Sequence, residues 1–239
     1  MATRTLGILE ADQVDGPLKD QFGDYPAMFA GLLGAADEVT HRVYRASRGE
    51  LPESVDECDA YLITGSRFSV YDDEPWIRAL GELVVRLDAA RKKLVGVCFG
   101  HQLIAHVLGG RTEAAPVGWC VGVRKSEILF PLPWMAPYRE TVALPASHRD
   151  QVAVLPDRAR VFASGERCPI AGYVIDDHIL AIQAHPEFGK PYSRALLERR
   201  RPMIGEERYE EAVASYGADT DQSLLADWIN RFITEDTRA

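Results

Sequence analysis

The sequence predicts an α/β fold with a mainly parallel central sheet and helices on both of its faces. Two observations support this prediction. Short apolar runs alternate with helical patterns along the first 110 residues, which is the arrangement of βαβ units. The chain also has 239 residues, 46% of them hydrophobic, which is enough to build one large core. We therefore expect a single domain over residues 1–239.

The first half of the chain supplies the expected parallel strands and their helices. Apolar runs at 6–9, 39–45, 60–64 and 94–97 are expected as strands, and the patterns at 26–33, 74–90 and 99–108 as helices. Pro75 suits the first turn of one helix, and Gly109-Gly110 ends the next. Residues 20–24 are expected as a polar turn.

Residues 118–182 differ from the rest because short β-type runs follow one another without helices between them. These runs lie at 121–123, 142–144, 152–155, 160–163, 171–175 and 179–182. The pattern predicts a β-rich excursion that returns to the main sheet at its end. From about residue 190 the tail is expected to be helical, at 192–200, 206–216 and 221–232. We interpret the basic run 199–201 as a complement to the negative end of the first of these helices.

Composition narrows the functional classes. The net charge of −9 argues against nucleic acid or an anionic membrane as a main partner. No apolar run approaches the ~20 residues that span a bilayer, and no signal peptide is evident. The four cysteines have no Cys-x-x-Cys spacing, which argues against a disulfide framework or a zinc site. We expect a cytoplasmic protein without a bound metal.

A candidate nucleophile stands where the 94–97 strand meets the following helix. Cys98 lies between Gly96 and Gly100, in the cysteine version of the Gly-x-Ser-x-Gly nucleophile elbow. A tight turn of this kind leaves no room for side chains beside it, which explains the flanking glycines. The positive end of the helix and a nearby histidine would favour the thiolate. A buried structural cysteine is the alternative, and the two glycines argue against it.

A nucleophile of this type needs a base, and the base needs a group that orients it. His185 and Glu187 follow the 179–182 strand and lie two residues apart, so an extended backbone projects both side chains to one side. Pro186 favours that extended backbone at His185 and stiffens the pair. Cys98, His185 and Glu187 are therefore predicted to form a catalytic triad.

Together, the motif from Gly96 to Gln102 and the motif from His185 to Glu187 resemble those of the class I (triad) glutamine amidotransferases. The similarity extends over roughly residues 5–190 and includes the segments 65–76 and 147–152. These segments most resemble the glutaminase domain of GMP synthase. The resemblance implies a flavodoxin-like sheet of the kind found in this family.

The resemblance also implies an oxyanion hole. One donor would be the backbone N–H of Phe99, directly after the nucleophile, and the other would come from the loop at Gly65 and Ser66. Many family members have two glycines in this loop. This chain has Gly-Ser instead, and Ser66 still provides an N–H group.

Four further residues are candidates for substrate binding. Gln102 lies one helical turn after Cys98 on the same face, and the resemblance implies that it holds the substrate; the alternative is an exposed polar residue of the first turn. His148 would lie beside the substrate or cap its own loop. Arg67 and Tyr71 would recognise the α-amino and α-carboxylate ends of a glutamyl group, unless their loop is merely solvated.

The predicted reaction is hydrolysis of the γ-amide of glutamine or of a γ-glutamyl compound. A γ-glutamyl thioester on Cys98 would form and then release glutamate, together with ammonia or an amine. The sequence has no Gly-x4-Gly-Lys phosphate loop, so no cofactor is expected, and any ATP-dependent synthetase would be a separate subunit.

Two versions of this reaction remain open. The chain either donates ammonia to such a synthetase or acts as a stand-alone γ-glutamyl peptidase or γ-glutamyl-amine hydrolase. A catalytically silent binding or regulatory module and a different cysteine hydrolase with the same elbow are the further alternatives.

Overall fold

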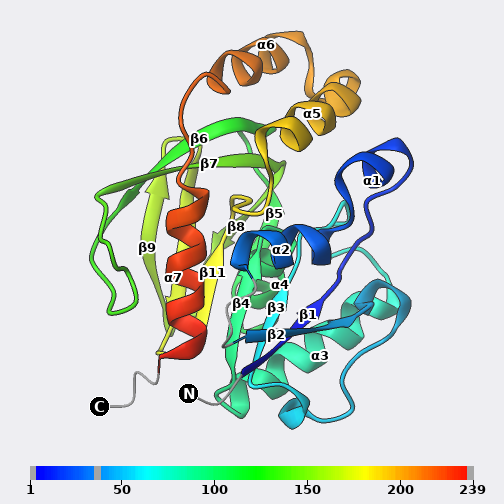
Figure 1. Cartoon of the computed structure of the whole chain (residues 1–239), viewed down its shortest axis with the longest axis vertical. Coiled ribbons are helices and arrows are strands. Elements are labelled where there is room, and N and C mark those ends of the chain that lie inside the picture. The colour runs from blue at the N-terminus through cyan, green and yellow to red at the C-terminus, as the bar shows by residue number, and fades with distance from the viewer. Residues whose placement is uncertain (1–3, 35–38, 236–239) are drawn as a thin grey trace.

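The computed structural model describes residues 4–34 and 39–235, and its main feature is one mixed sheet of 9 strands (Figure 1). Five neighbouring strands are parallel, in the order β2 (Val39–Tyr44), β1 (Arg4–Leu9), β3 (Ala60–Ile63), β4 (Lys93–Val97) and β11 (Ile179–Ile182). The sheet continues with antiparallel strands, in the order β10 (Cys168–Ile175), β9 (Ala159–Gly165), β6 (Cys120–Ile128) and β7 (Thr141–His148). The predicted fold class is confirmed.

The β-rich excursion extends the main sheet. Its strands β10, β9, β6 and β7 are added beyond β11, so hydrogen bonding continues from the parallel half into the antiparallel half. A small second sheet joins β5 (Arg111–Ala114) to β8 (Asp150–Val154). The sequence analysis missed β5, because its polar sequence Arg-Thr-Glu-Ala lacks an apolar run. The single domain over residues 1–239 stays a prediction.

Helices cover both faces of the parallel strands. On one face, α2 (Tyr25–Leu33) and α7 (Gln222–Thr234) pack against side chains such as Leu62 and Val95. On the other face, α3 (Pro75–Ala89) and α4 (Phe99–Val107) pack against side chains such as Ile63 and Leu94. Successive strand residues point to opposite faces, so a strand buried on both sides needs a continuous apolar run.

The helices α5 (Lys190–Ile204) and α6 (Glu206–Ser215) lie together at one end of the molecule, next to β6 and β7 (Figure 1). The short helix α1 (Pro17–Phe22) contacts α5. Two local predictions were wrong. Residues 20–22 belong to α1, whose first turn begins at Pro17. The basic run 199–201 lies inside α5, which continues through Pro202 because Ile204 packs into a small core with α6.

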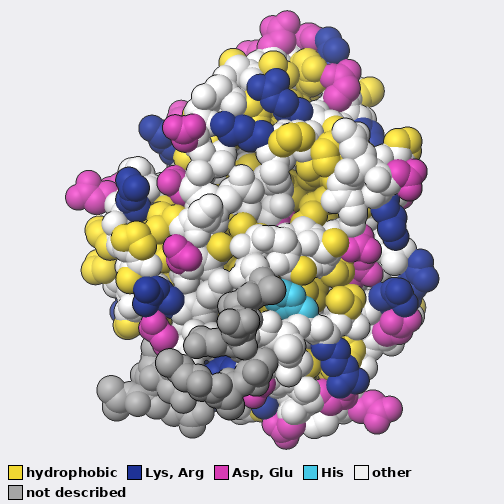
Figure 2. All heavy atoms as spheres, in the orientation of Figure 1, with side chains coloured by type: hydrophobic (Ala, Val, Ile, Leu, Met, Phe, Trp, Pro, Cys, Tyr) yellow, Lys and Arg dark blue, Asp and Glu magenta, His cyan; other side chains and the backbone are white. Residues whose placement is uncertain are grey.

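Acidic and basic side chains are interspersed on the face shown in Figure 2, with hydrophobic side chains between them. The face does not present a single continuous basic surface. In the part of the chain that the structure describes, no helix is both long and apolar enough to cross a membrane.

Two glycine substitutions test how closely the elbow helix packs on the sheet. A Cβ atom at Gly100 would lie 2.6 Å from the carbonyl oxygen of Ile63, so Gly100→Ala should lower the free energy of unfolding by about 1–3 kcal/mol. A Cβ atom at Gly31, in α2, would meet open space. Gly31→Ala should therefore raise the free energy of unfolding by about 0.5–1 kcal/mol. Urea unfolding of both variants checks these opposite signs, and equal effects would contradict the packing argument.

Candidate active site

Cys98 stands at the carboxyl end of β4 in an unusual backbone conformation. Its φ is 52° and its ψ is −98°, and it directly precedes the first residue of α4. A Cβ atom at Gly96 would lie 2.6 Å from Ile104 Cδ1 and 2.7 Å from the carbonyl carbon of Gly100. The flanking glycines therefore allow the strand and helix to meet closely, and the strained turn between them raises the Cys98 side chain above the sheet.

Sheet pairing brings the predicted base to this cysteine. The Cys98 N–H donates to the carbonyl of Ile182 at 2.9 Å, so β4 and β11 end side by side. The chain then leads from β11 to His185, whose backbone N–H donates to the Pro145 carbonyl of β7 at 2.8 Å. Because the carboxyl ends of neighbouring parallel strands share one edge, residues 98 and 185 meet there despite their separation in sequence.

His185 and Glu187 form a buried pair. His185 Nδ1 lies 2.8 Å from Glu187 Oε1, and both residues are almost inaccessible to solvent. The carboxylate accepts a hydrogen bond from Nδ1, which leaves Nε2 for another partner. Burial lowers the pKa of His185, but the side chains of Cys98 and Glu187 outweigh burial and raise it to about 10. The imidazolium form is therefore favoured in this setting.

An aromatic ring fixes the plane of the His185 imidazole. Phe188 stacks on it with a centroid separation of 3.8 Å and an interplanar angle of 5°. Tyr192 in turn packs edge-on against Phe188 at 4.6 Å. The sequence analysis did not single out Phe188, because a buried aromatic residue after a strand has no distinctive sequence signal.

Gly65 marks the point where the loop after β3 meets the other two segments. A Cβ atom at this position would lie 2.8 Å from His185 Cε1 and 3.7 Å from Cys98 Cβ. The loop therefore lies against both the nucleophile and the base. This contact also explains why Gly65 is the position that must lack a side chain, while Ser66 is tolerated next to it.

Three backbone amides surround this meeting point. Among the described residues, the N–H groups of Gly65, Ser66 and Phe99 have no hydrogen-bond acceptor. Phe99 is the first residue of α4, where helix amides lack partners within the helix. The Ser66 hydroxyl accepts from Phe68 N at 3.2 Å and so shapes its own loop. These amides are available to hold a negatively charged oxygen above Cys98.

A cavity of about 500 Å³ opens above the nucleophile. It is lined by residues 12–15, 66–69 and 147–150, by Cys98, Gln102 and Trp119, and by side chains of α1, α2 and α5. A cavity of this size suits a small organic molecule. Cys98 is only 5% exposed, so a ligand in the cavity would reach it from one direction.

Gln102, which was predicted to bind the substrate, forms hydrogen bonds within the wall of this cavity. Its amide nitrogen donates to the Asp150 carbonyl at 2.7 Å and lies 3.2 Å from Gln183 Oε1. His148 also lines the cavity, and its Nδ1 lies 3.1 Å from the same Asp150 carbonyl. Burial lowers the pKa of His148 to about 4, so its ring is neutral near pH 7. The sequence left two roles open for His148, beside the substrate or as a cap of its own loop. Its position in the structure is compatible with both.

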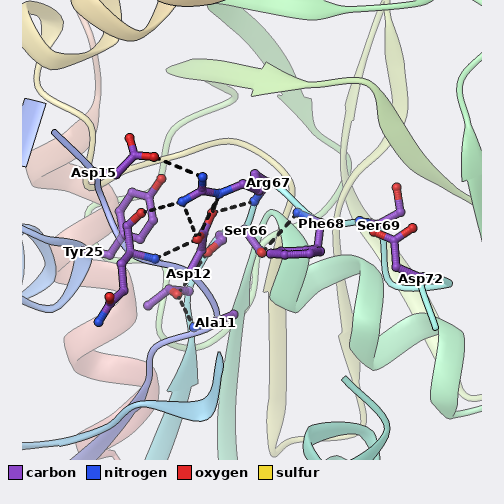
Figure 3. Close-up of polar contacts among 12 residues, drawn as sticks. Ala11, Asp12, Asp15, Tyr25, Ser66, Arg67, Phe68, Ser69 and Asp72 are labelled. Carbon is purple, nitrogen blue, oxygen red and sulfur yellow. Dashed lines mark hydrogen bonds and ion pairs between the residues drawn. The ribbon is translucent and has the colours of Figure 1, made fainter. Parts of the chain in front are cut away.

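Arg67 lines the cavity, but carboxylates occupy its guanidinium group (Figure 3). Its Nε lies 2.9 Å from Asp12 Oδ2, and its Nη1 lies 3.1 Å from Asp15 Oδ2. Tyr71 is 45% exposed, is not part of the cavity wall, and donates to Asp150 Oδ2 at 3.0 Å. The polar groups of both residues are thus engaged in contacts that support the loop.

Asp150 is a site residue that the sequence analysis missed. It is buried, and its Oδ2 accepts from Ser69 Oγ at 2.5 Å as well as from Tyr71, so it joins two walls of the cavity. Arg149 Nε lies 3.6 Å from Asp150 Oδ1. The only available signal was the position of Arg149-Asp150 directly after His148. Among the described residues, no group of His, Cys, Asp or Glu side chains is arranged to hold a metal ion.

Comparison with known proteins agrees with the fold. Residues 38–200 match the model of the family described as Glutamine amidotransferase class-I. The chain is 33% identical over 190 residues to gamma-glutamyl peptidase 3 of Arabidopsis thaliana, with 76% of each chain covered. It is 26% identical over 144 residues to a GMP synthase [glutamine-hydrolyzing] of Bacteroides fragilis, covering 58% of this chain and 26% of that protein.

A solved structure shows the same fold. The crystal structure of a glutamine amidotransferase from Thermotoga maritima has a TM-score of 0.78 and 17% identity, and the match covers 98% of this chain and 100% of that chain. The chain therefore belongs to the class-I glutamine amidotransferase family. Within that family it is a cysteine-dependent amidohydrolase.

The reactivity of the four cysteines provides a test of the site geometry. Cys98 lines the cavity, whereas burial raises the pKa of Cys120 to about 11 and raises that of Cys168 further. Iodoacetamide at pH 7.5 should therefore alkylate Cys98 before the other three, as measured by peptide mass spectrometry over time. His185→Ala should slow this labelling. Faster labelling of Cys120 or Cys168 in the native protein would contradict the assignment.

Proposed function

We propose that this protein is a stand-alone γ-glutamyl hydrolase that cleaves the γ-amide bond of small γ-glutamyl compounds. The observation that carries the proposal is the convergence of Cys98, His185 and the Gly65 loop beneath an open cavity. The relatives support the choice of substrate class. Two named gamma-glutamyl peptidases of Arabidopsis thaliana match 76% and 87% of this chain.

The first half of the reaction forms an acyl-enzyme. The Cys98 thiolate attacks the γ-carbonyl carbon, and the amides of Phe99 and the Gly65-Ser66 loop bind the resulting oxyanion. His185 Nε2 then transfers its proton to the departing nitrogen, so the C–N bond breaks and a γ-glutamyl thioester remains. Glu187 holds the imidazolium by accepting from Nδ1.

The second half restores the enzyme. His185, now neutral, takes a proton from water as that water attacks the thioester carbonyl. The same amides hold the second oxyanion, the C–S bond breaks, and glutamate leaves with Cys98 as thiolate. For the glutamyl α-ammonium we propose Asp150 Oδ1, a buried carboxylate oxygen with no hydrogen-bond partner among the described residues, with Gln102 beside it. Arg67 and Tyr71 are not chosen because their polar groups are engaged in loop contacts.

The match to GMP synthase favours a second candidate function, in which glutamine is the substrate and ammonia passes to a separate synthetase subunit.

We further propose a cytoplasmic location, because all four cysteines are free.

Glutamate release from purified protein distinguishes the two functions. The substrates are glutamine and a panel of γ-glutamyl amines and peptides, with Cys98→Ala as the control. Cys98-dependent turnover that favours the γ-glutamyl compounds supports the stand-alone hydrolase. Slow turnover of glutamine that a synthetase partner accelerates would support the ammonia donor, and no glutamate from any substrate would refute both.

Glu187→Gln tests how the base is held. An amide at position 187 can donate to Nδ1 and impose the wrong tautomer, so kcat should fall by roughly 10²–10⁴-fold. The wild-type His185, with its pKa raised to about 10, keeps its proton into the alkaline range. Loss of the Glu187 charge lowers that pKa, so the alkaline limb of the kcat/KM profile should move to lower pH.

The matched control for this experiment is Glu198→Gln, an exposed carboxylate on α5. It should leave both the rate and the pH profile unchanged. A Glu187→Gln enzyme whose alkaline limb stays at the wild-type position would show that Glu187 does not act on His185.

A further inference from the structure

Four arginines line the cavity, and three of them are paired with carboxylates. The pairs are Arg67 with Asp12 and Asp15, Arg199 with Asp15, and Arg149 with Asp150. Arg200 is different. Within residues 4–34 and 39–235, no carboxylate lies within ion-pair distance of its guanidinium group. The cavity therefore contains one arginine whose charge no carboxylate of the described residues balances.

Arg200 is nevertheless held firmly in place. Its Nη1 donates to Ser147 Oγ at 2.7 Å and to the Ser147 carbonyl at 3.1 Å. Its guanidinium carbon lies 5.5 Å from the centroid of the Trp119 ring, which also lines the cavity. A guanidinium group has five N–H donors, so Nε and Nη2 remain available to a ligand. An oriented, half-buried guanidinium over an aromatic ring is well suited to binding a carboxylate through two hydrogen bonds.

The position of Arg200 indicates which end of the substrate it meets. Its anchor Ser147 lies two residues along β7 from Pro145, a distance of about 7 Å at the usual rise of a strand. Pro145 is the residue whose carbonyl accepts the backbone N–H of His185. Since His185 must lie beside the departing nitrogen, the anchoring of Arg200 on the strand that holds His185 points to the leaving-group side of the site.

The part of the cavity wall that Asp150 forms with the 66–69 loop has a different character. There Gln102 donates to the Asp150 carbonyl, and the buried Asp150 carboxylate faces the 66–69 loop through Ser69. An acidic, amide-lined wall of this kind suits the α-ammonium group of the glutamyl moiety. The Arg200 guanidinium and the Asp150 carboxylate thus carry the two charges that complement the two ends of a γ-glutamyl amino acid.

We propose that Arg200 and Trp119 form a subsite for a carboxylate carried by the leaving amine. The preferred leaving group is then an α-amino acid or a short peptide, and ammonia and neutral amines are poorer leaving groups. This inference rests on the proposed γ-glutamyl hydrolase activity and adds the chemistry of the second half of the substrate. It also gives a role to Arg200, the middle residue of the basic run 199–201 that was expected to complement the helix end.

A matched pair of substrates tests the subsite. γ-Glutamylalanine and γ-glutamylethylamide differ only in the carboxylate of the leaving group. The wild-type kcat/KM should be about 10- to 100-fold higher for γ-glutamylalanine, as expected for a charge-assisted hydrogen-bonded pair. γ-Glutamylalanylglycine, whose carboxylate lies one residue further out, shows whether an amino acid or a dipeptide fits better.

Variants separate binding at Arg200 from damage to the fold. Arg200→Met should raise KM for the carboxylate substrates by a similar factor and leave the ethylamide parameters unchanged. Arg200→Lys keeps the charge and should retain part of the preference. The control is Arg201→Met, which removes a neighbouring arginine that pairs with Glu206 outside the cavity.

Three outcomes would overturn the proposal in distinguishable ways. A wild-type enzyme with equal kcat/KM for γ-glutamylalanine and γ-glutamylethylamide has no carboxylate subsite. An equal loss on both substrates in Arg200→Met would place Arg200 at the glutamyl α-carboxylate or in the fold. A lack of Cys98-dependent glutamate release from every substrate would remove the hydrolase activity itself, and the subsite with it.

Discussion

The active site depends on one parallel strand pairing. β4 and β11 are neighbours in the sheet, and the hydrogen bond from Cys98 N to the Ile182 carbonyl continues that pairing one residue beyond the end of β4. The nucleophile and the segment that carries the base therefore leave the sheet at the same edge. More than 80 residues separate Cys98 from His185, and the intervening β-rich excursion brings the chain back in the required register.

The close approach at this edge requires residues without side chains. Gly96 and Gly100 let α4 start directly above β4, while Gly65 lets the loop after β3 contact the His185 ring. These three glycines allow the nucleophile, the base and the backbone amides of Gly65, Ser66 and Phe99 to lie close together. The φ of 52° at Cys98 is the conformational consequence, and the packed helix and sheet on either side stabilise it.

The charged side chains of the cavity have two different roles, since some support its walls and others are available to a ligand. Carboxylates hold Arg67 and Arg199, and these ion pairs tie the segment at 12–15 to the loop after β3 and to α5. Asp150 joins the other wall through Ser69 and Tyr71. Most charged groups in the cavity thus maintain its shape, and few remain for a ligand. Arg200 is the cavity-lining arginine that has no carboxylate partner among the described residues, and its contact with Ser147 connects it to the strand that supports His185.

The sequence by itself determined the parallel strands, the elbow at Cys98 and the pairing of His185 with Glu187. These features have local causes: apolar runs, flanking glycines, and two side chains on one short extended segment. Only the tertiary structure decided which polar residues are free to act. Arg67 and Tyr71 were expected at the substrate, but Asp12 and Asp150 occupy them. Arg200 was assigned to a helix end, but α5 carries it over the cavity. An ion-pair or hydrogen-bond partner that is distant in the chain cannot be recognised from the local sequence pattern. Whether a charged side chain is available to a ligand therefore depends on the packing of the folded chain.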